Sequence, residues 1–261
     1  ENKGDIFKDK TTHYGIDNSG LRGVVIGDMD NNGYTDIVKW RFMSEAQPDY
    51  DCSDYDYETI CTDDTNCYWE ENNCWNGSDF GTMPHNILMN NGNNTFITNT
   101  FLPSTELRFL HSLGIIDADL DGDLDLLAIQ EEDDDQFILY INNGYNNGEL
   151  EFNETFSYYR DYGDISSSRV IAISDYDNDG DQDVYVARKY GKNWFFENQT
   201  LVKTSSEVLY NSNPDPFFIE RAVELGIADQ DVNEVGSMGY GAAWGDYDND
   251  QDFDLYLTNW G

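Results

Sequence analysis

Basic residues are scarce in this 261-residue chain, which has 14 Lys and Arg against 52 Asp and Glu and a formal net charge of -38. A protein that holds nucleic acid by neutralising phosphates needs the opposite charge, and so does one that docks on an anionic membrane surface. No apolar run reaches the roughly 18 residues that a membrane-spanning helix requires. We therefore expect no nucleic-acid partner and no membrane insertion, and the charge favours cations as partners.

Catalytic motifs are also missing. The three histidines, His13, His85 and His111, lie in unrelated contexts, and there is no G-x-S-x-G, H-E-x-x-H or glycine-rich phosphate-binding motif. Carboxylates are so abundant that any glycosidase acid–base pair would be an arbitrary choice. We predict no catalytic residues and no enzymatic activity, although a fold by itself leaves room for an enzyme such as a polysaccharide lyase.

What the chain has in abundance is aspartate with one repeated spacing. Four segments, here named loops 1 to 4, follow the pattern D-x-D-x-[DN]-G-x-x-D at residues 28–36, 117–125, 175–183 and 246–254, with Gln251 replacing the glycine in loop 4. Oxygens from positions 1, 3 and 5 of a tight loop can converge on one cation, position 7 adds its backbone carbonyl, and a later carboxylate completes the shell. Such hard oxygen ligands are typical of Ca²⁺ sites.

The spacing therefore predicts about four structural Ca²⁺ ions. Acidic turns without metal are the alternative, but carboxylates crowded so closely repel one another unless a cation neutralises them. Glycine at position 6 permits a positive φ, so Gln251 is expected to weaken loop 4. The predicted ligands are Asp28, Asp30, Asn32, Tyr34 and Asp36; Asp117, Asp119, Asp121, Asp123 and Asp125; Asp175, Asp177, Asp179, Asp181 and Asp183; and Asp246, Asp248, Asp250, Asp252 and Asp254.

The flanks of the loops favour strands. An EF-hand would place a bidentate Glu at position 12 between two helices, whereas loop 1 has Lys39 there and loop 3 has Val186. The runs on either side, such as Leu21–Ile26 and Val184–Ala187, are short and β-branched. Asn-Gly turns at 91–92 and 143–144 indicate hairpins, so each unit holds about four short strands, the size of a propeller blade.

These units resemble the FG-GAP/VCBS repeat family, the calcium-loop blades of integrin-α-like β-propellers. The matching residues are 27–33, 174–184, 245–250 and 254–259, together with the outer-strand segment 86–96, and the resemblance covers nearly the whole chain except 45–83. It implies an all-β fold: a β-propeller or partial propeller of about four four-stranded blades spanning 1–261, with Ca²⁺ held inside the blades. A fragment, a small propeller or a unit completed by a neighbouring subunit all remain open.

All four cysteines, Cys52, Cys61, Cys67 and Cys74, lie within 23 residues and lack the C-x₂-C pairs of a zinc site. The cluster predicts two disulfides of unknown connectivity in a stapled insertion, 45–83, within the first blade, with four free thiols as the alternative. Disulfides indicate an extracellular or secretory location. Four sequons are candidate N-glycosylation sites, at Asn76, Asn93, Asn153 and Asn198, although an Asn-rich chain has several by chance.

These features together predict a secreted calcium-binding repeat protein with a structural or adhesive role. Its predicted partner is a second copy of itself, as in a surface or filament assembly, or another surface protein. The alternative is a carbohydrate-binding, lectin-like module, because the chain has 18 Tyr and 6 Trp whose ring faces suit sugar rings.

Overall fold

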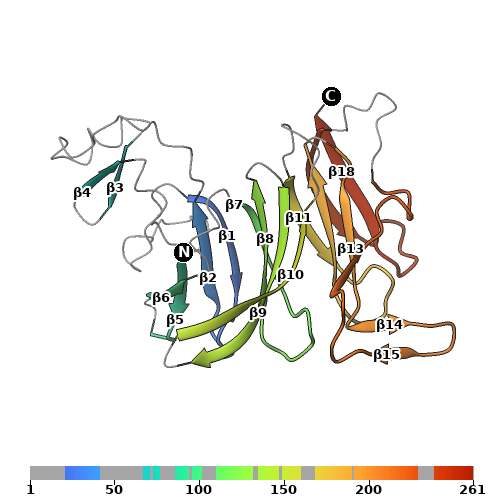
Figure 1. Cartoon of the computed structure of the whole chain (residues 1–261), viewed down its shortest axis with the longest axis horizontal. Coiled ribbons are helices and arrows are strands. Elements are labelled where there is room, and N and C mark those ends of the chain that lie inside the picture. The colour runs from blue at the N-terminus through green and yellow to red at the C-terminus, as the bar shows by residue number, and fades with distance from the viewer. Residues whose placement is uncertain are drawn as a thin grey trace, which may run out of the picture. The chain divides into compact units, whose positions relative to one another are not determined.

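The computed structural model of the chain describes residues 21–41, 67–70, 73–76, 86–93, 96–101, 110–131, 135–146, 149–159, 168–189, 191–228 and 238–260. These residues form strands joined by turns and bends, and they include no helix (Figure 1). It follows that none of them belongs to an apolar helix of membrane-spanning length. The chain divides into two compact units, 1–109 and 110–261, and each is described by itself. The predicted all-β class is confirmed for the described residues.

Three antiparallel sheets of four strands, named sheets 1 to 3, dominate the structure, and each follows the order of the chain. Sheet 1 lies in the first unit and consists of β1 (Leu21–Gly27), β2 (Asp36–Arg41), β5 (Asn86–Asn90) and β6 (Phe96–Phe101). Sheet 2 consists of β7 (Leu110–Ile116), β8 (Asp125–Glu131), β9 (Asp135–Asn146) and β10 (Glu149–Tyr159). Sheet 3 consists of β11 (Ser168–Ser174), β12 (Asp183–Arg188), β13 (Trp194–Asn198) and β16 (Phe218–Glu220).

Three two-stranded sheets complete the described part of the chain. They are β3 (Cys67–Glu70) with β4 (Asn73–Asn76), β14 (Leu201–Lys203) with β15 (Val208–Tyr210), and β17 (Met238–Gly245) with β18 (Asp254–Trp260), the last named sheet 4. Of the four predicted blades, three thus have four strands, and the fourth has two among the described residues. The fourth strands of sheets 1, 2 and 3 share an aromatic residue at or near their start, at Phe96, Phe152 and Phe218.

Every acidic loop occupies the same place in its sheet. Each joins the first strand to the second, so the predicted strand–loop–strand arrangement is confirmed. The pairing of these two strands also carries a register shift near the start of the first strand in all four sheets, between Leu21 and Gly23, Leu110 and Ser112, Ser168 and Val170, and Gly239 and Gly241. A bulge that recurs at one position marks the four sheets as copies of one structural unit.

The core of the second unit lies between neighbouring sheets. Residues of β13 alternate between two clusters, because successive side chains of a strand point to opposite faces. Trp194 and Phe196 pack with Phe137 of sheet 2, where the rings of Phe137 and Phe196 stack with centroids 4.2 Å apart. Phe195 packs on the other side, with Trp244 of sheet 4. This double-sided burial holds the strands that carry loops 2, 3 and 4.

The predicted cysteine-rich insertion falls between β2 and β5, which pair directly although residues 42–85 separate them in the sequence. Of this segment only β3 and β4 are described, and Cys67 and Cys74 lie on these two paired strands. Cys52 and Cys61 lie outside the described residues. The two disulfides therefore stay a prediction.

One predicted glycosylation site is incompatible with the fold. The side chain of Asn198 is 1% exposed, and its Nδ2 donates to the carbonyl oxygen of Ala118 at 2.9 Å. A glycan on this nitrogen would need space that a buried side chain lacks and would break that hydrogen bond, so the prediction at Asn198 is wrong. Asn93 and Asn153 are exposed, and Asn76 lies on β4. Glycosylation at these three sites stays a prediction.

Candidate metal centres

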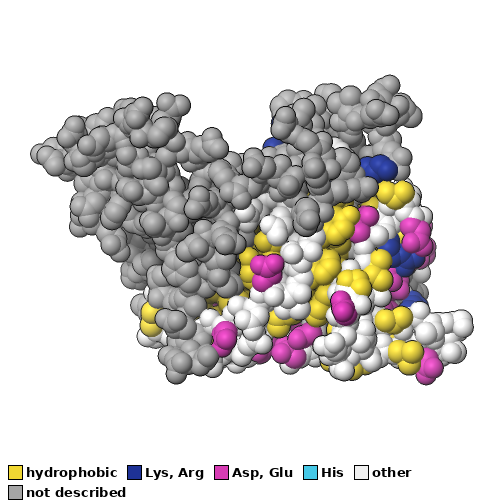
Figure 2. Space-filling model, in the orientation of Figure 1, with side chains coloured by type: hydrophobic (Ala, Val, Ile, Leu, Met, Phe, Trp, Pro, Cys, Tyr) yellow, Lys and Arg dark blue, Asp and Glu magenta, His cyan; other side chains and the backbone are white. Residues whose placement is uncertain are grey.

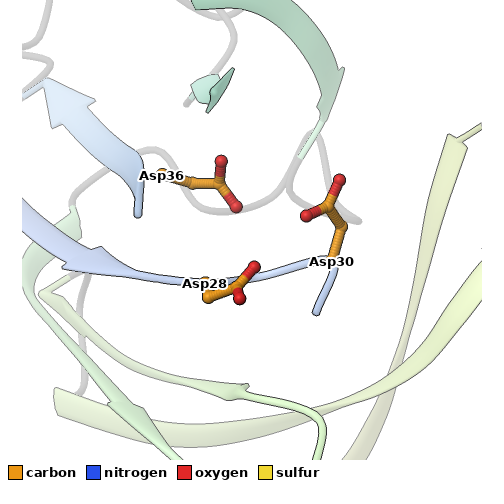
Figure 3. A group of neighbouring side chains, drawn as sticks. All are labelled: Asp28, Asp30 and Asp36. Carbon is orange, nitrogen blue, oxygen red and sulfur yellow. The ribbon is translucent and has the colours of Figure 1, made fainter. Parts of the chain in front are cut away.

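Each acidic loop brings three carboxylates together. In every group one oxygen of each Asp lies within 4.8 Å of the other two. Figure 3 shows the carboxylates of loop 1 directed at a common space. Because Ca²⁺ binds oxygens at about 2.3–2.6 Å, ligands on opposite sides of one ion are about 5 Å apart, and this spacing fits. The groups are Asp28, Asp30 and Asp36; Asp117, Asp119 and Asp125; Asp175, Asp177 and Asp183; and Asp246, Asp248 and Asp250.

The carboxylate at position 9 is the most buried member of the first three groups. Asp36 and Asp125 are 0% exposed and Asp183 is 2% exposed. One oxygen of each accepts a hydrogen bond from the main-chain N–H at position 2 of its own loop, which closes the loop. The donors are Met29 for Asp36 at 2.8 Å, Ala118 for Asp125 at 2.7 Å, Tyr176 for Asp183 at 3.1 Å and, in loop 4, Tyr247 for Asp254 at 3.0 Å.

The other oxygen of the position 9 carboxylate reaches the third strand of the sheet. It accepts the main-chain N–H of an asparagine at or near the end of that strand: Asn90 for Asp36 at 2.7 Å, Asn142 for Asp125 at 2.9 Å and Asn198 for Asp183 at 3.0 Å. The side chains of these asparagines donate back to the carbonyl at position 8 of the loop, at Thr35, Leu124 and Gln182. Position 9 therefore ties together three strands of one sheet.

These three asparagines position the carboxylates of the candidate sites, and the sequence reasoning missed them. Their Oδ1 atoms accept the main-chain N–H two residues later, from Gly92, Gly144 and Thr200, so each also shapes its turn. The available signal was the recurring Asn-Asn-Gly, Asn-Asn-Gly and Asn-Gln-Thr at 90–92, 142–144 and 198–200. The first two were interpreted only as hairpin turns.

The carboxylate at position 1 shapes the loop backbone. In loops 1, 3 and 4 it accepts the main-chain N–H groups of positions 5 and 6, at 2.8–3.2 Å. In loop 2 the Oδ1 atom of Asp117 is buried and has no hydrogen-bond partner among the described residues. A buried oxygen without a partner is costly, and a cation is the partner that an acceptor-only carboxylate can use.

Positions 5 and 7 do not enter the three-carboxylate groups of loops 1 to 3. The position 5 side chains accept the N–H of position 7: Asn32 from Tyr34 at 2.8 Å, Asp121 from Asp123 at 2.8 Å and Asp179 from Asp181 at 3.1 Å. The buried side chain of Asp181 accepts the N–H of Leu201 at 2.6 Å. In loop 4 position 5 replaces position 9 in the group, and all three members are exposed. The full predicted ligand sets stay predictions.

The loops need two residues with positive φ. At position 6 the values are 87° for Gly33, 94° for Gly122, 105° for Gly180 and 80° for Gln251. Position 4 is also in this region, with Asn31, Asn178 and Asn249 in three loops and Leu120 at 61° in loop 2. The expectation that Gln251 must adopt a left-handed conformation is confirmed, and Leu120 carries the same kind of strain without having been predicted.

Replacing Gln251 with glycine is expected to stabilise the protein by about 1 kcal/mol, because an L-residue in the left-handed region costs roughly 1–2 kcal/mol and part of the gain is lost to unfolded-chain entropy. The side chain is exposed, so no packing is lost. Thermal unfolding of the two proteins in calcium measures the change. Gln199→Gly, in a turn where φ is not positive, serves as the control and should not stabilise. A lower melting temperature for Gln251→Gly would contradict the strain argument.

Burial gives several of these carboxyls unusual proton affinities. Desolvation raises the pKa of Asp125 and of Asp183 to about 8, despite the main-chain hydrogen bonds that oppose the shift. Desolvation, followed by the neighbouring Asp121, raises the pKa of Asp119, and burial likewise raises the pKa values of Asp36 and Asp177. Without a cation, Asp125 and Asp183 therefore retain protons near neutral pH. A divalent ion would supply the opposing charge that lets them ionise.

The comparison with protein families identifies the repeat type of one part of the chain. The model of the FG-GAP-like repeat matches residues 117–186, which extend from the first residue of loop 2 into β12 and include all of loop 3. The chain contains an FG-GAP-like repeat. FG-GAP repeats are typically non-enzymatic and often bind Ca²⁺, and the resemblance predicted from the sequence is confirmed over this segment. No curated protein matches the chain.

Proposed function

We propose that the chain is a non-enzymatic, extracellular protein whose FG-GAP repeats bind Ca²⁺ and which has a structural or adhesive role. The observation that carries the proposal is that a group of three carboxylates lies in the loop between the first two strands of each of the four sheets. FG-GAP repeats are usually extracellular, which supports the location. The acidic side chains visible in Figure 2, scattered with few basic ones on the described part of that face, also suit a partner or ligand that carries positive charge.

The proposed role of the ions is to fasten one end of each sheet. Ca²⁺, when bound, supplies the positive charge that lets the clustered carboxylates ionise together. In sheets 1 to 3 the chain's own contribution is geometric: position 9 holds the first, second and third strands through two main-chain N–H groups, and positions 1 and 3 face it across the loop. Loss of the ion would remove the bridge between these carboxylates at the point where three strands meet.

A propeller arrangement of the blades is part of the proposal. Within the second unit, β11 packs against β7 and against β17, so the first strands of sheets 2, 3 and 4 are neighbours. Adjacent blades of a propeller place their innermost strands side by side in this way. With four strands in each of sheets 2 and 3, this supports radial stacking of FG-GAP blades.

The proposed partner is a second copy of the chain or another surface protein. The hairpin β14–β15 supports this, because it leaves Val208, Leu209 and Tyr210 exposed at 44%, 48% and 62%. Light scattering of the purified chain, in calcium and after chelation, tests the assembly. Large particles that depend on calcium are expected, and a compact monomer at high protein concentration in both conditions would contradict self-assembly.

A carbohydrate-binding module is the second candidate, and one cavity favours it. Beside loop 4 a cavity of about 550 Å³ is lined by Trp244, Tyr247 and Tyr256 together with Asp246 and Asp254. Tyr247 and Tyr256 are 85% and 71% exposed, as ring faces that stack on sugars would be. A glycan array with the chain and its Tyr256→Ala variant tests this candidate. Binding that the variant loses would favour it, and no binding at all would eliminate it.

A further inference from the structure

We propose that the ion sites of loops 2 and 3 are coupled through the turn 198–200, so that an ion in either loop raises the Ca²⁺ affinity of the other. The coupling rests on the proposed calcium binding and goes beyond it, because it assigns Asn198 and Thr200 as positioning residues shared by two sites. Neither residue belongs to a three-carboxylate group.

The turn after β13 is bonded to both loops. Toward loop 3, the main-chain N–H of Asn198 donates to Asp183 Oδ1 at 3.0 Å. Toward loop 2, Asn198 Nδ2 and Thr200 Oγ1 both donate to the carbonyl oxygen of Ala118, at 2.9 and 2.8 Å. Asn198 and Thr200 are each 1% exposed and Ala118 is 0% exposed, so water does not compete for these bonds.

These bonds form a continuous path between two candidate ligands. The N–H of Ala118 donates to Asp125 Oδ2 at 2.7 Å, while its carbonyl is held by Asn198, which in turn holds Asp183. Asp125 and Asp183 occupy position 9 of loops 2 and 3. Only Ala118 and Asn198 therefore separate the most buried carboxylate of one site from that of the other.

The hairpin that follows the turn touches both loops again, at position 3 of each. Lys203 Nζ donates to the main-chain carbonyl of Asp177 in loop 3, and the hydroxyl of Tyr210 donates to the main-chain carbonyl of Asp119 in loop 2 at 3.5 Å. The segment 198–210 thus contacts each loop at two places. Both places lie beside carboxylates of that loop's three-carboxylate group. A change in either loop reaches the other through this segment by two routes.

The coupling follows from the conformational order that a bound ion would impose on its loop and on the turn 198–200. An ion in loop 2 fixes Asp125 relative to Asp117 and Asp119, which fixes Ala118 and, through it, the turn. An ion entering loop 3 then finds Asn198 and Asp183 already placed and loses less conformational entropy on binding. The effect is reciprocal, because coupling between two binding equilibria must be the same in both directions.

Glycine amides provide a site-resolved test. Gly33, Gly122 and Gly180 occupy position 6 of loops 1, 2 and 3, so a protein labelled with ¹⁵N-glycine reports the occupancy of each loop during a calcium titration. Asp177→Asn disables loop 3 and retains the oxygen that accepts the N–H of Asp179. It is expected to lower the affinity reported by Gly122 about fivefold, the lower end of typical coupling, without changing the affinity reported by Gly33.

The reciprocal variant is Asp119→Asn, which disables loop 2 and retains the acceptor for the N–H of Asp121. The affinity reported by Gly180 should fall by the same factor. Thr200→Val removes one hydrogen bond to Ala118 with little change of shape. In this background, Asp177→Asn should lower the calcium affinity reported by Gly122 by a clearly smaller factor. Thr155→Val is the matched control, because the Thr155 hydroxyl donates to the carbonyl oxygen of Asn153 on β10, outside the segment 198–210, and it should leave the coupling intact.

The outcomes separate the two proposals. If no loop glycine shifts with calcium, the proposed calcium binding is wrong. If the glycines titrate but Gly122 reports the same affinity with and without Asp177→Asn, calcium binding stands and the coupling is overturned. Coupling that persists unchanged in Thr200→Val would overturn the assignment of the turn as its route.

Discussion

Asp183→Ala is expected to lower the free energy of unfolding by about 2–6 kcal/mol, with or without calcium, because it leaves two buried N–H groups without an acceptor at about 1–3 kcal/mol each. These donors are the main-chain N–H groups of Tyr176 and Asn198. They belong to loop 3 and to the end of β13, so their loss loosens the connection between the strands of sheet 3. Urea unfolding of the wild type and the variant measures the difference.

Asp183→Asn separates the structural part of this effect from the metal part. Burial raises the pKa of Asp183 to about 8, so its carboxyl is largely neutral at pH 7 without an ion and the amide removes little charge. The amide oxygen can accept only one of the two N–H groups, and its Nδ2 faces the other, at a cost of about 1–3 kcal/mol. In calcium the wild type gains an ionised ligand that the variant lacks. We therefore expect a loss of about 1–3 kcal/mol in chelator and a clearly larger one in calcium.

The control is Glu207→Gln, which removes one negative charge from an exposed side chain outside the acidic loops. It should be close to neutral in both conditions. Equal losses for Asp183→Asn with and without calcium would show that this carboxylate does not serve an ion. An Asp183→Ala variant as stable as the wild type would show that position 9 does not hold the sheet.

The loss of stability that Asp125 and Asp183 cause in chelator as the pH rises is expected to be largely removed when calcium is added. Burial raises the folded-state pKa values of Asp125 and Asp183 from 3.8 to about 8, so between these values the folded chain binds more protons than the unfolded chain. Stability in chelator is then greatest below about pH 4 as far as these groups are concerned, and is lost as the pH rises toward 8. Calcium competes with those protons, so its stabilising effect should grow over the same interval.

The size of the calcium effect can be estimated at the upper end of that interval. At a calcium concentration of about 100 Kd, one site contributes about 2.7 kcal/mol, which corresponds to roughly 5–10 °C in melting temperature for a unit of this size. Scanning calorimetry from pH 5 to pH 8, in calcium and in chelator, measures the interval between the two melting temperatures. A calcium effect that shrinks as the pH rises would contradict the protonation argument.

Local spacing made the acidic loops predictable. The Asp positions of a loop lie within nine residues, so their convergence follows from the sequence, as do the β-branched strands on both sides. The positive φ at position 6 was predictable from glycine, and Gln251 could be recognised as an exception. Position 4 was not predicted, since Leu120 conceals the preference that Asn31, Asn178 and Asn249 share.

Long-range partners could not be predicted in the same way. The position 9 carboxylate meets its asparagine 54 residues later in sheet 1, 17 in sheet 2 and 15 in sheet 3. The separation varies with what is inserted between the second and third strands, so no fixed offset reveals the pair. The burial of Asn198 depends in addition on contact with loop 2, which is why a sequon pattern was a poor guide there.

The most direct test of the central claim is the number of Ca²⁺ ions that the chain binds, measured by equilibrium dialysis for the wild type and for Asp30→Asn, Asp119→Asn, Asp177→Asn and Asp248→Asn. About four ions per chain are expected, one for each three-carboxylate group, and each variant should lose the ion of its own loop. A chain that binds no calcium at millimolar concentration, or a stoichiometry that none of the four variants changes, would contradict the assignment of the acidic loops as calcium sites.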